Sequence, residues 1–230
     1  MTFLSNMWKI IKGIFLAIRL LLRPNGGIFA LIELGNLIED IRASKLAADI
    51  IMKDPGAEKL VAERYSKGLP DIATLGTYPE GSLGKELHLH LTRLDSDHYP
   101  VPLRKDYSEQ IYIRERRREI HDLMHVVAGY DTTYKNEACL NAFVAAQGPM
   151  PICILIPIGV MLRYIFKFPN KLDELCNALI DAWQRGKAAN SIFSIRWEEY
   201  LDQPLEDARV ALFVKADSEP VARIPRATVA

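Results

Sequence analysis

His121-Asp122-Leu123-Met124-His125, followed by Glu137 after eleven intervening residues, is the stretch around which the chain is organised. On an α-helix, residues four apart lie about 40° from each other around the axis, so His121 and His125 face the same way. Asp122 lies about 60° round from His125 and therefore remains within reach of an ion on that face. The spacing predicts three potential metal ligands on less than two turns of one helix.

Glu137 can join these ligands only if the chain turns between them. On a straight helix, twelve residues at about 1.5 Å each would carry it about 18 Å beyond the second imidazole. Gly129 can end the first helix in the left-handed conformation, and the polar residues Asp131, Thr132 and Thr133 can cap a second helix. The sequence therefore predicts a helix hairpin that brings Glu137 back towards the two imidazoles.

Two imidazoles and two carboxylates form a mixed nitrogen and oxygen ligand set. Such a set suits Zn²⁺, Mn²⁺ or Fe²⁺ better than Ca²⁺. The alternative is a surface His pair beside an ordinary acidic residue, because a His-x-x-x-His spacing often occurs without a metal. The adjacent Asp, the delayed Glu and the presence of only five His in the chain favour a metal site. Zn²⁺ is the ion expected first, with Fe²⁺ or Mn²⁺ as alternatives.

Four segments of the chain carry a family pattern in order. They are "YPEGSLGKEL" (78–87), "REIHDLMHVVAGYDTTYKNEACLNAF" (118–143), "AAQGPMPICIL" (145–155) and "RWEEYLDQPLEDARVALFV" (196–214). Together they resemble the fourth Coq protein family of coenzyme Q (ubiquinone) biosynthesis, with its H-D-x-x-H-x11-E motif, over residues 28–214. Asp131 and Asn136 stand where the family pattern has Pro and Gly. These departures concern the geometry of the turn rather than the ligands.

The resemblance implies a function as well as a fold. It implies a carboxy-lyase of quinone biosynthesis, which removes the ring carboxylate at C1 of a polyprenylated 4-hydroxybenzoate-type acid, with hydroxylation at that carbon. The metal ligands would be His121, Asp122, His125 and Glu137. The implied partners are the polyprenylated lipid, the membrane surface, other quinone-biosynthesis proteins and a second copy of the chain. The implied location is the bacterial cytoplasm, peripheral on the inner membrane. The family's eukaryotic members lie at the mitochondrial inner membrane.

Two other function classes remain open. The family resemblance also fits a lipid-binding scaffold that organises a quinone-biosynthesis complex around a structural metal, although closed structural zinc sites favour Cys ligands. A hydrolase is the third class, since H-E-x-x-H metalloproteases place a general base after the first His. Asp122 is one methylene shorter than that Glu, and no third ligand pattern of the class is present.

A cluster of basic residues precedes the metal motif. One long helix is predicted to run from Ser108 through the metal motif. On it Arg114, Arg117 and Arg118 lie seven, four and three residues before His121, on or near its face. One of these arginines could bind a substrate anion through two parallel hydrogen bonds. The alternative is a solvated face whose charges are balanced by neighbouring glutamates.

The composition indicates one compact domain of 230 residues with no net charge. Lys plus Arg and Asp plus Glu number 29 each, so no global field attracts nucleic acid. The cysteines, Cys139, Cys153 and Cys176, form no C-x-x-C pair, which favours a reducing compartment. Since no segment alternates with period two, the predicted class is all-α.

The N-terminal segment over 3–22 is predicted to be an amphipathic helix on a membrane surface. Lys9, Lys12 and Arg19 interrupt it, so no uncharged run reaches the roughly 20 residues of a span. A core helix is the alternative, and the segment after it lacks a signal-peptide cleavage site. The predicted divisions are this helical segment at 1–24, an all-α metal-binding and lipid-binding domain at 25–214 and a loose tail at 215–230.

The remaining helices follow from apolar periodicity and capping residues. They are expected near 28–41, 47–52, 57–65, 82–93, 138–146, 152–168, 170–185, 194–201 and 205–213. The apolar helix over 152–168 is predicted either to be buried or to form one wall of a tunnel for an isoprenoid tail. His88 and His90 lie about 200° apart on their helix, so both are predicted to be structural.

Overall fold

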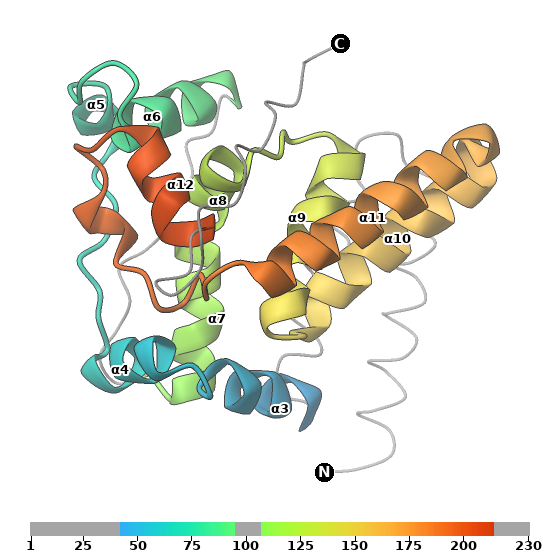
Figure 1. Ribbon diagram of the computed structural model, residues 1–230, viewed down its shortest axis with the longest axis horizontal. Coiled ribbons are helices and arrows are strands. Elements are labelled where there is room, and N and C mark those ends of the chain that lie inside the picture. The colour runs from blue at the N-terminus through green and yellow to red at the C-terminus, as the bar shows by residue number, and fades with distance from the viewer. Residues whose placement is uncertain (1–41, 95–106, 214–230) are drawn as a thin grey trace, which may run out of the picture. The chain divides into compact units, whose positions relative to one another are not determined.

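The computed structural model describes residues 42–94 and 107–213 of the chain (Figure 1). Within these ranges it contains helices and no named strand, so the predicted all-α class is confirmed. None of the helices in this part of the chain is both long and apolar enough to cross a membrane. The helices predicted over 3–22 and 28–41, the tail over 215–230 and the predicted division points at 24 and 214 lie outside the described residues.

The described residues form α-helices and two short 3-10 helices. In chain order they are α3 (Arg42–Ile51), α4 (Pro55–Glu63), α5 (Ile72–Leu75), α6 (Leu83–Arg93), α7 (Glu109–Glu119), α8 (His121–Ala128), α9 (Tyr134–Gln147), α10 (Pro151–Lys167), η1 (Pro169–Lys171), α11 (Leu172–Ala188), η2 (Trp197–Glu199) and α12 (Leu205–Phe213). The described residues divide into two compact units. One consists of residues 42–47 with 133–187, and the other of residues 48–94 and 107–132 with 188–213.

Side-chain caps define where several helices begin. The Ser82 hydroxyl accepts a hydrogen bond from the backbone N–H of Lys85 at 3.2 Å, so α6 begins where the sequence predicts. At the start of α7 the Ser108 hydroxyl accepts a hydrogen bond from the backbone N–H of Ile111 at 3.4 Å. These polar residues satisfy N–H groups that the first helical turn leaves without partners.

The predicted long helix from Ser108 through the metal motif is wrong. Helix α7 ends at Glu119, and α8 begins at His121. Between them Ile120 has φ −92° and ψ 3°, outside the helical region, and its side chain is fully buried. Neither Gly nor Pro marks this break in the sequence, so helix-stop signals could not predict it.

A buried ion triad lies in the same unit as this break. The Arg116 guanidinium donates to the Glu119 carboxylate at 2.7 Å and to both carboxylate oxygens of Glu198. All three side chains are at most 1% exposed. Burial alone would lower the pKa of Arg116, but its contacts with Glu198 and Glu119 outweigh this and hold that pKa above its usual value. Burial raises the pKa of Glu119, against the lowering by Arg116.

Helices α9, α10 and α11 share an apolar core. Ala138, Val160 and Leu175, one from each helix, are almost completely buried together. Gly186, the predicted end of the helix that begins near Asn170, lies inside α11 instead. A Cβ atom there would stand 2.3 Å from the carbonyl oxygen of Phe143, so this glycine permits close approach of two backbones. Asn170 belongs to the short helix η1, so α11 begins at Leu172 and not at the predicted residue 170.

Candidate metal centre

His121 and His125 occupy one face of α8, as their four-residue spacing predicts. Their rings meet edge to face, with centroids 4.8 Å apart and planes at 86°. His125 is 2% exposed, whereas His121 is half-buried. The pair therefore offers one deeply buried and one more accessible imidazole.

The end of α8 orients the ring of His125. Gly129 takes the left-handed conformation at φ 77°, as predicted for this turn, and its N–H donates to the carbonyl of His125 at 3.0 Å. The backbone then places the carbonyl of Tyr130 3.0 Å from Nδ1 of the His125 ring. A carbonyl can only accept, so Nδ1 carries the proton and Nε2 keeps its lone pair for a metal ion. Sequence reasoning missed this contact because a backbone carbonyl has no residue signature.

Glu137 lies in the first turn of α9. The Thr133 hydroxyl caps this helix by accepting from the N–H of Asn136 at 3.4 Å, and the Glu137 N–H donates to the Thr133 carbonyl at 2.8 Å. The Glu137 side chain is 7% exposed. A buried carboxylate requires a cation or several donors to compensate for lost hydration.

His121, His125 and Glu137 form a group that could hold a metal ion. Each offers one ligand atom, and these atoms lie within 4.8 Å of one another. Two imidazole nitrogens and a carboxylate oxygen are ligands that divalent transition metals accept. The donor chemistry, the burial of Glu137 and the fixed tautomer of His125 therefore all fit a bound divalent ion.

Asp122, the remaining predicted ligand, is not a member of this group. It lies half-buried in the first turn of α8, next to His121. The pKa of His90 is lowered overall by burial and by the charge of His125. The negative charge of Asp122 acts in the opposite direction, with a smaller effect than either. Its role as a metal ligand stays a prediction.

Helix α6 brings a further imidazole to this region. The ring of His90 stacks on that of His125, with centroids 5.4 Å apart and planes at 24°. Burial lowers the pKa of His90, and the neighbouring charge of His125 lowers it further. The sequence did not indicate this contact, because it depends on the packing of α6 against α8. His88, by contrast, hydrogen-bonds the carbonyl of Ile72 through Nδ1 at 2.8 Å and has the structural role expected of it.

The three arginines predicted to bind substrate all lie on α7. Arg114 donates to Glu115 at 2.8 Å, and Arg118, with a side chain 58% exposed, lies 3.5 Å from the same carboxylate. Arg117 is half-buried, and its Nε has no hydrogen-bond partner within the described residues. Since α7 ends before His121, their angular relation to the metal motif no longer follows from helical spacing. Their role in binding substrate stays a prediction.

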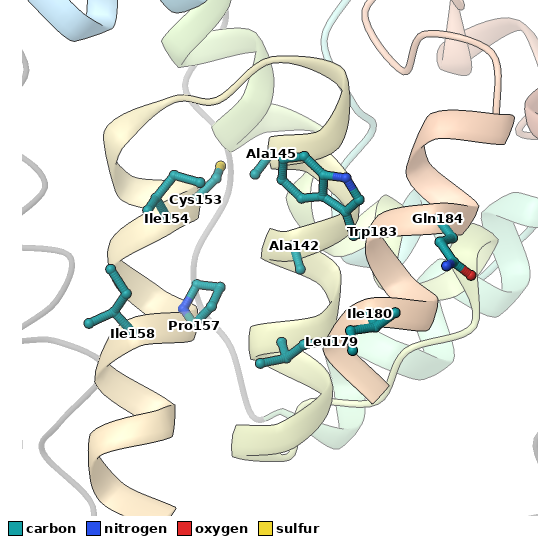
Figure 2. Close-up of a pocket in the computed structure, with 10 residues that line it drawn as sticks. All are labelled: Ala142, Ala145, Cys153, Ile154, Pro157, Ile158, Leu179, Ile180, Trp183 and Gln184. Atoms are coloured by element: carbon teal, nitrogen blue, oxygen red, sulfur yellow. The ribbon is translucent and has the colours of Figure 1, made fainter. Parts of the chain in front are cut away.

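An apolar cavity of about 360 Å³ is formed by α9, α10 and α11 (Figure 2). Its lining residues are Ala142, Ala145, Cys153, Ile154, Pro157, Ile158, Leu179, Ile180, Trp183 and Gln184. Ile158 and Ile180 are 46% and 56% exposed, so this lining continues onto the surface. Helix α10 is therefore only partly buried, and one of its faces lines a cavity of the size that small ligands occupy, roughly 300–1,000 Å³.

Comparison with known families identifies the chain over most of its length. The family model described as "Coenzyme Q (ubiquinone) biosynthesis protein Coq4" matches residues 11–217. The mitochondrial ubiquinone biosynthesis protein COQ4 homologue of Mus musculus is 32% identical over 173 residues, which are 73% of this chain and 64% of the mouse protein. The Homo sapiens homologue is 31% identical over 180 residues, 76% of this chain and 67% of the human protein. The chain thus spans somewhat under two thirds of the mouse relative.

A solved structure shows the same fold. A crystal structure of a protein from Nostoc punctiforme superposes with a TM-score of 0.74 at 24% sequence identity. The match covers 89% of this chain and 98% of that one. At this level of identity the similarity shows the fold alone.

Proposed function

The chain belongs to the family of the coenzyme Q (ubiquinone) biosynthesis protein Coq4, and from that premise we propose that it is a metal-dependent enzyme of ubiquinone biosynthesis. In the proposed reaction the bond between C1 and the carboxylate of a polyprenylated 4-hydroxybenzoate-type acid breaks with release of CO2, and C1 gains a hydroxyl group. The oxygen atom and the two-electron oxidation would come from an external oxidant such as O2, delivered with a redox partner. The observation that supports this proposal best is the group of His121, His125 and Glu137, with ligand atoms within 4.8 Å of one another.

These three residues would hold the metal, with Asp122 as a fourth ligand. Zn²⁺ is the proposed ion and Fe²⁺ or Mn²⁺ the alternative. A divalent ion, when bound, supplies Lewis-acid stabilisation of charge that develops on an aromatic ring. The protein's contribution is to hold the ligands, because the Tyr130 carbonyl orients His125 and burial keeps water from the carboxylate of Glu137.

The arginines of α7 are the proposed binding partner of the substrate carboxylate. We propose that one of Arg114, Arg117 and Arg118 pairs with this carboxylate before it leaves. Arg117 is the strongest candidate, since Arg114 and Arg118 already contact Glu115. A planar guanidinium matches the two oxygens of a carboxylate better than an ammonium does.

The polyprenyl tail requires an apolar surface, and the cavity of α9, α10 and α11 supplies one. Its lining side chains are mostly hydrocarbon, and Cys153, Trp183 and Gln184 contribute the other atoms (Figure 2). We propose that part of the tail lies in this cavity and that residues 3–22 bind the membrane surface peripherally, on the cytoplasmic side of a bacterial inner membrane. Other quinone-biosynthesis proteins and a second copy of the chain are the proposed protein partners.

The exposed apolar side chains of α10 and α11 also favour a second function. A lipid-binding scaffold of a quinone-biosynthesis complex would use the same surface, which includes Phe166 at 69% exposure and Ile180 at 56%. In that case the metal would be structural, and changing its ligands would affect stability more than product formation.

Glu137→Gln separates the two functions. The substitution keeps the size of the side chain and removes one negative charge from the ligand group. For an enzyme, we expect a quinone-deficient strain that carries this variant to accumulate the uncleaved prenylated acid, measured by mass spectrometry. Glu174→Gln, at an exposed carboxylate paired with Lys135, is the matched control and should restore quinone fully. Normal quinone output from a verified metal-free Glu137→Gln protein would leave only the scaffold.

A further inference from the structure

His90 contributes an imidazole beside the metal-ligand group. Neither the fold nor the ligand set explains the role of this residue. Its ring and that of His121 both pack against the ring of His125, at centroid distances of 5.4 and 4.8 Å. His90 comes from α6, and the other two residues come from α8. The packing of these two helices therefore assembles three imidazoles in one place.

The Nε2 atom of His90 is buried and has no hydrogen-bond partner within the described residues. Buried polar atoms are nearly always paired, so an unpaired one in a folded protein requires an explanation. His88, two residues earlier on α6, has such a partner in the carbonyl of Ile72. Within the described residues, Nε2 of His90 therefore lacks the kind of partner that the ring of its neighbour has.

His90 is not part of the ligand group itself. The atoms that lie within 4.8 Å of one another belong to His121, His125 and Glu137. An imidazole nitrogen next to such a group, but outside it, can hydrogen-bond a molecule that binds there. Stacking on His125 restricts how the His90 ring can rotate, which favours a fixed direction for that bond.

We propose that Nε2 of His90 hydrogen-bonds an oxygen of the aromatic head group of the substrate. An imidazole can donate to a carboxylate or phenolate and can accept from a phenol, so it matches both oxygen groups of a hydroxybenzoate. This inference rests on the proposed function and adds to it a substrate-binding residue on α6. Its chemical basis is the pairing of a buried, unpartnered nitrogen with an oxygen ligand.

The test uses the full chain loaded with Co²⁺ and titrated with 4-hydroxybenzoate. The visible absorption of Co²⁺ reports on both metal loading and binding of the acid. His90→Phe keeps an aromatic ring against His125 and removes the nitrogen, whereas His90→Gln keeps a donor near the position of Nε2. His88→Asn is the matched control on α6, because its amide can replace the bond to the Ile72 carbonyl.

We expect His90→Phe to bind Co²⁺ as wild type does and to bind 4-hydroxybenzoate about 3- to 10-fold more weakly, the effect of one lost hydrogen bond. His90→Gln should recover part of this affinity, and His88→Asn should match wild type. If His90→Phe does not fold, His90→Leu replaces it.

Equal affinity for the acid in wild type and variant, or absence of binding to the loaded wild type, would overturn the role of His90. So would loss of Co²⁺ from the variant, since His90 would then support the metal. Failure of wild type to bind Co²⁺ would instead refute the proposed metal-dependent function.

Discussion

Replacing Arg116 with Met would leave two carboxylates buried without their cation. Arg116 is 1% exposed and forms hydrogen bonds with both Glu119 and Glu198. Removing one partner from a buried ion pair typically costs about 3–5 kcal/mol, because the remaining charge is neither hydrated nor paired. For a chain of this size, each kcal/mol shifts the melting temperature by about 2–4 °C. We therefore expect Arg116→Met to melt about 6–20 °C below wild type at neutral pH.

The pH dependence of this loss identifies its cause. Burial raises the pKa of Glu119, and Arg116 lowers it. Without Arg116 that lowering is lost, so the pKa of Glu119 rises further above its value in the unfolded chain. The folded variant then binds more protons than the unfolded chain, so its stability falls as pH rises through the window between the unfolded and the folded pKa of Glu119. The deficit relative to wild type should therefore be largest at neutral pH and should shrink as the pH is lowered towards 5.

Thermal unfolding followed by circular dichroism, at several pH values, measures both effects. Arg118→Met on the same helix is the control, since that side chain is 58% exposed and its loss should change stability by no more than about 0.5 kcal/mol. The triple variant Arg116→Met, Glu119→Gln, Glu198→Gln removes all three charges and should recover most of the lost stability. A shift in melting temperature as small as that of Arg118→Met, or a deficit independent of pH, would show that the triad is not an energetically coupled buried unit.

Two further predictions concern the metal and the membrane. His121→Ala and His125→Ala should each lose most bound metal, because each removes a proposed ligand. The decrease in metal affinity should exceed the roughly 10- to 100-fold that is typical when a residue behind the ligands is changed. Metal analysis of the purified proteins tests this, and stoichiometric metal in both variants would place the site elsewhere. Deleting residues 1–24 should move a folded protein from the membrane fraction to the soluble fraction, because the apolar face and interleaved cations of residues 3–22 would be lost; retention of the intact chain after carbonate washing would show an integral span instead.

Features that depend on local sequence were predictable. Ser82 and Ser108 begin helices where predicted, because a capping hydroxyl needs only an N–H three residues later in the chain. Gly129 ends α8 in the left-handed conformation for an equally local reason. The approach of His121 and His125 follows from helical geometry alone. Each of these interactions joins residues at most four positions apart.

Features that depend on packing were not predictable. The break at Ile120 accompanies a triad in which Arg116 reaches Glu198, a residue 82 positions away. Nothing local distinguishes that arginine from Arg117 or Arg118, which lie half-buried and exposed on the same helix. The stacking of His90 on His125 likewise requires α6 to pack on α8. A helical wheel predicts that His88 and His90 cannot share a metal, but it could not show that the ring of His90 stacks on a residue of α8.

The turn before Glu137 shows why sequence departures can leave a site intact. Asp131 and Asn136 replace the Pro and Gly of the family pattern, which put the geometry of the turn in question. The structure builds this turn from backbone groups and from Gly129 and Thr133. The Thr133 hydroxyl accepts from the backbone N–H of Asn136 at 3.4 Å, a donor that every residue except Pro provides. The Glu137 N–H then continues the helix through the Thr133 carbonyl. Because neither of these two bonds uses the side chain of Asn136, the start of α9 that carries Glu137 forms without the Gly of the family pattern at position 136.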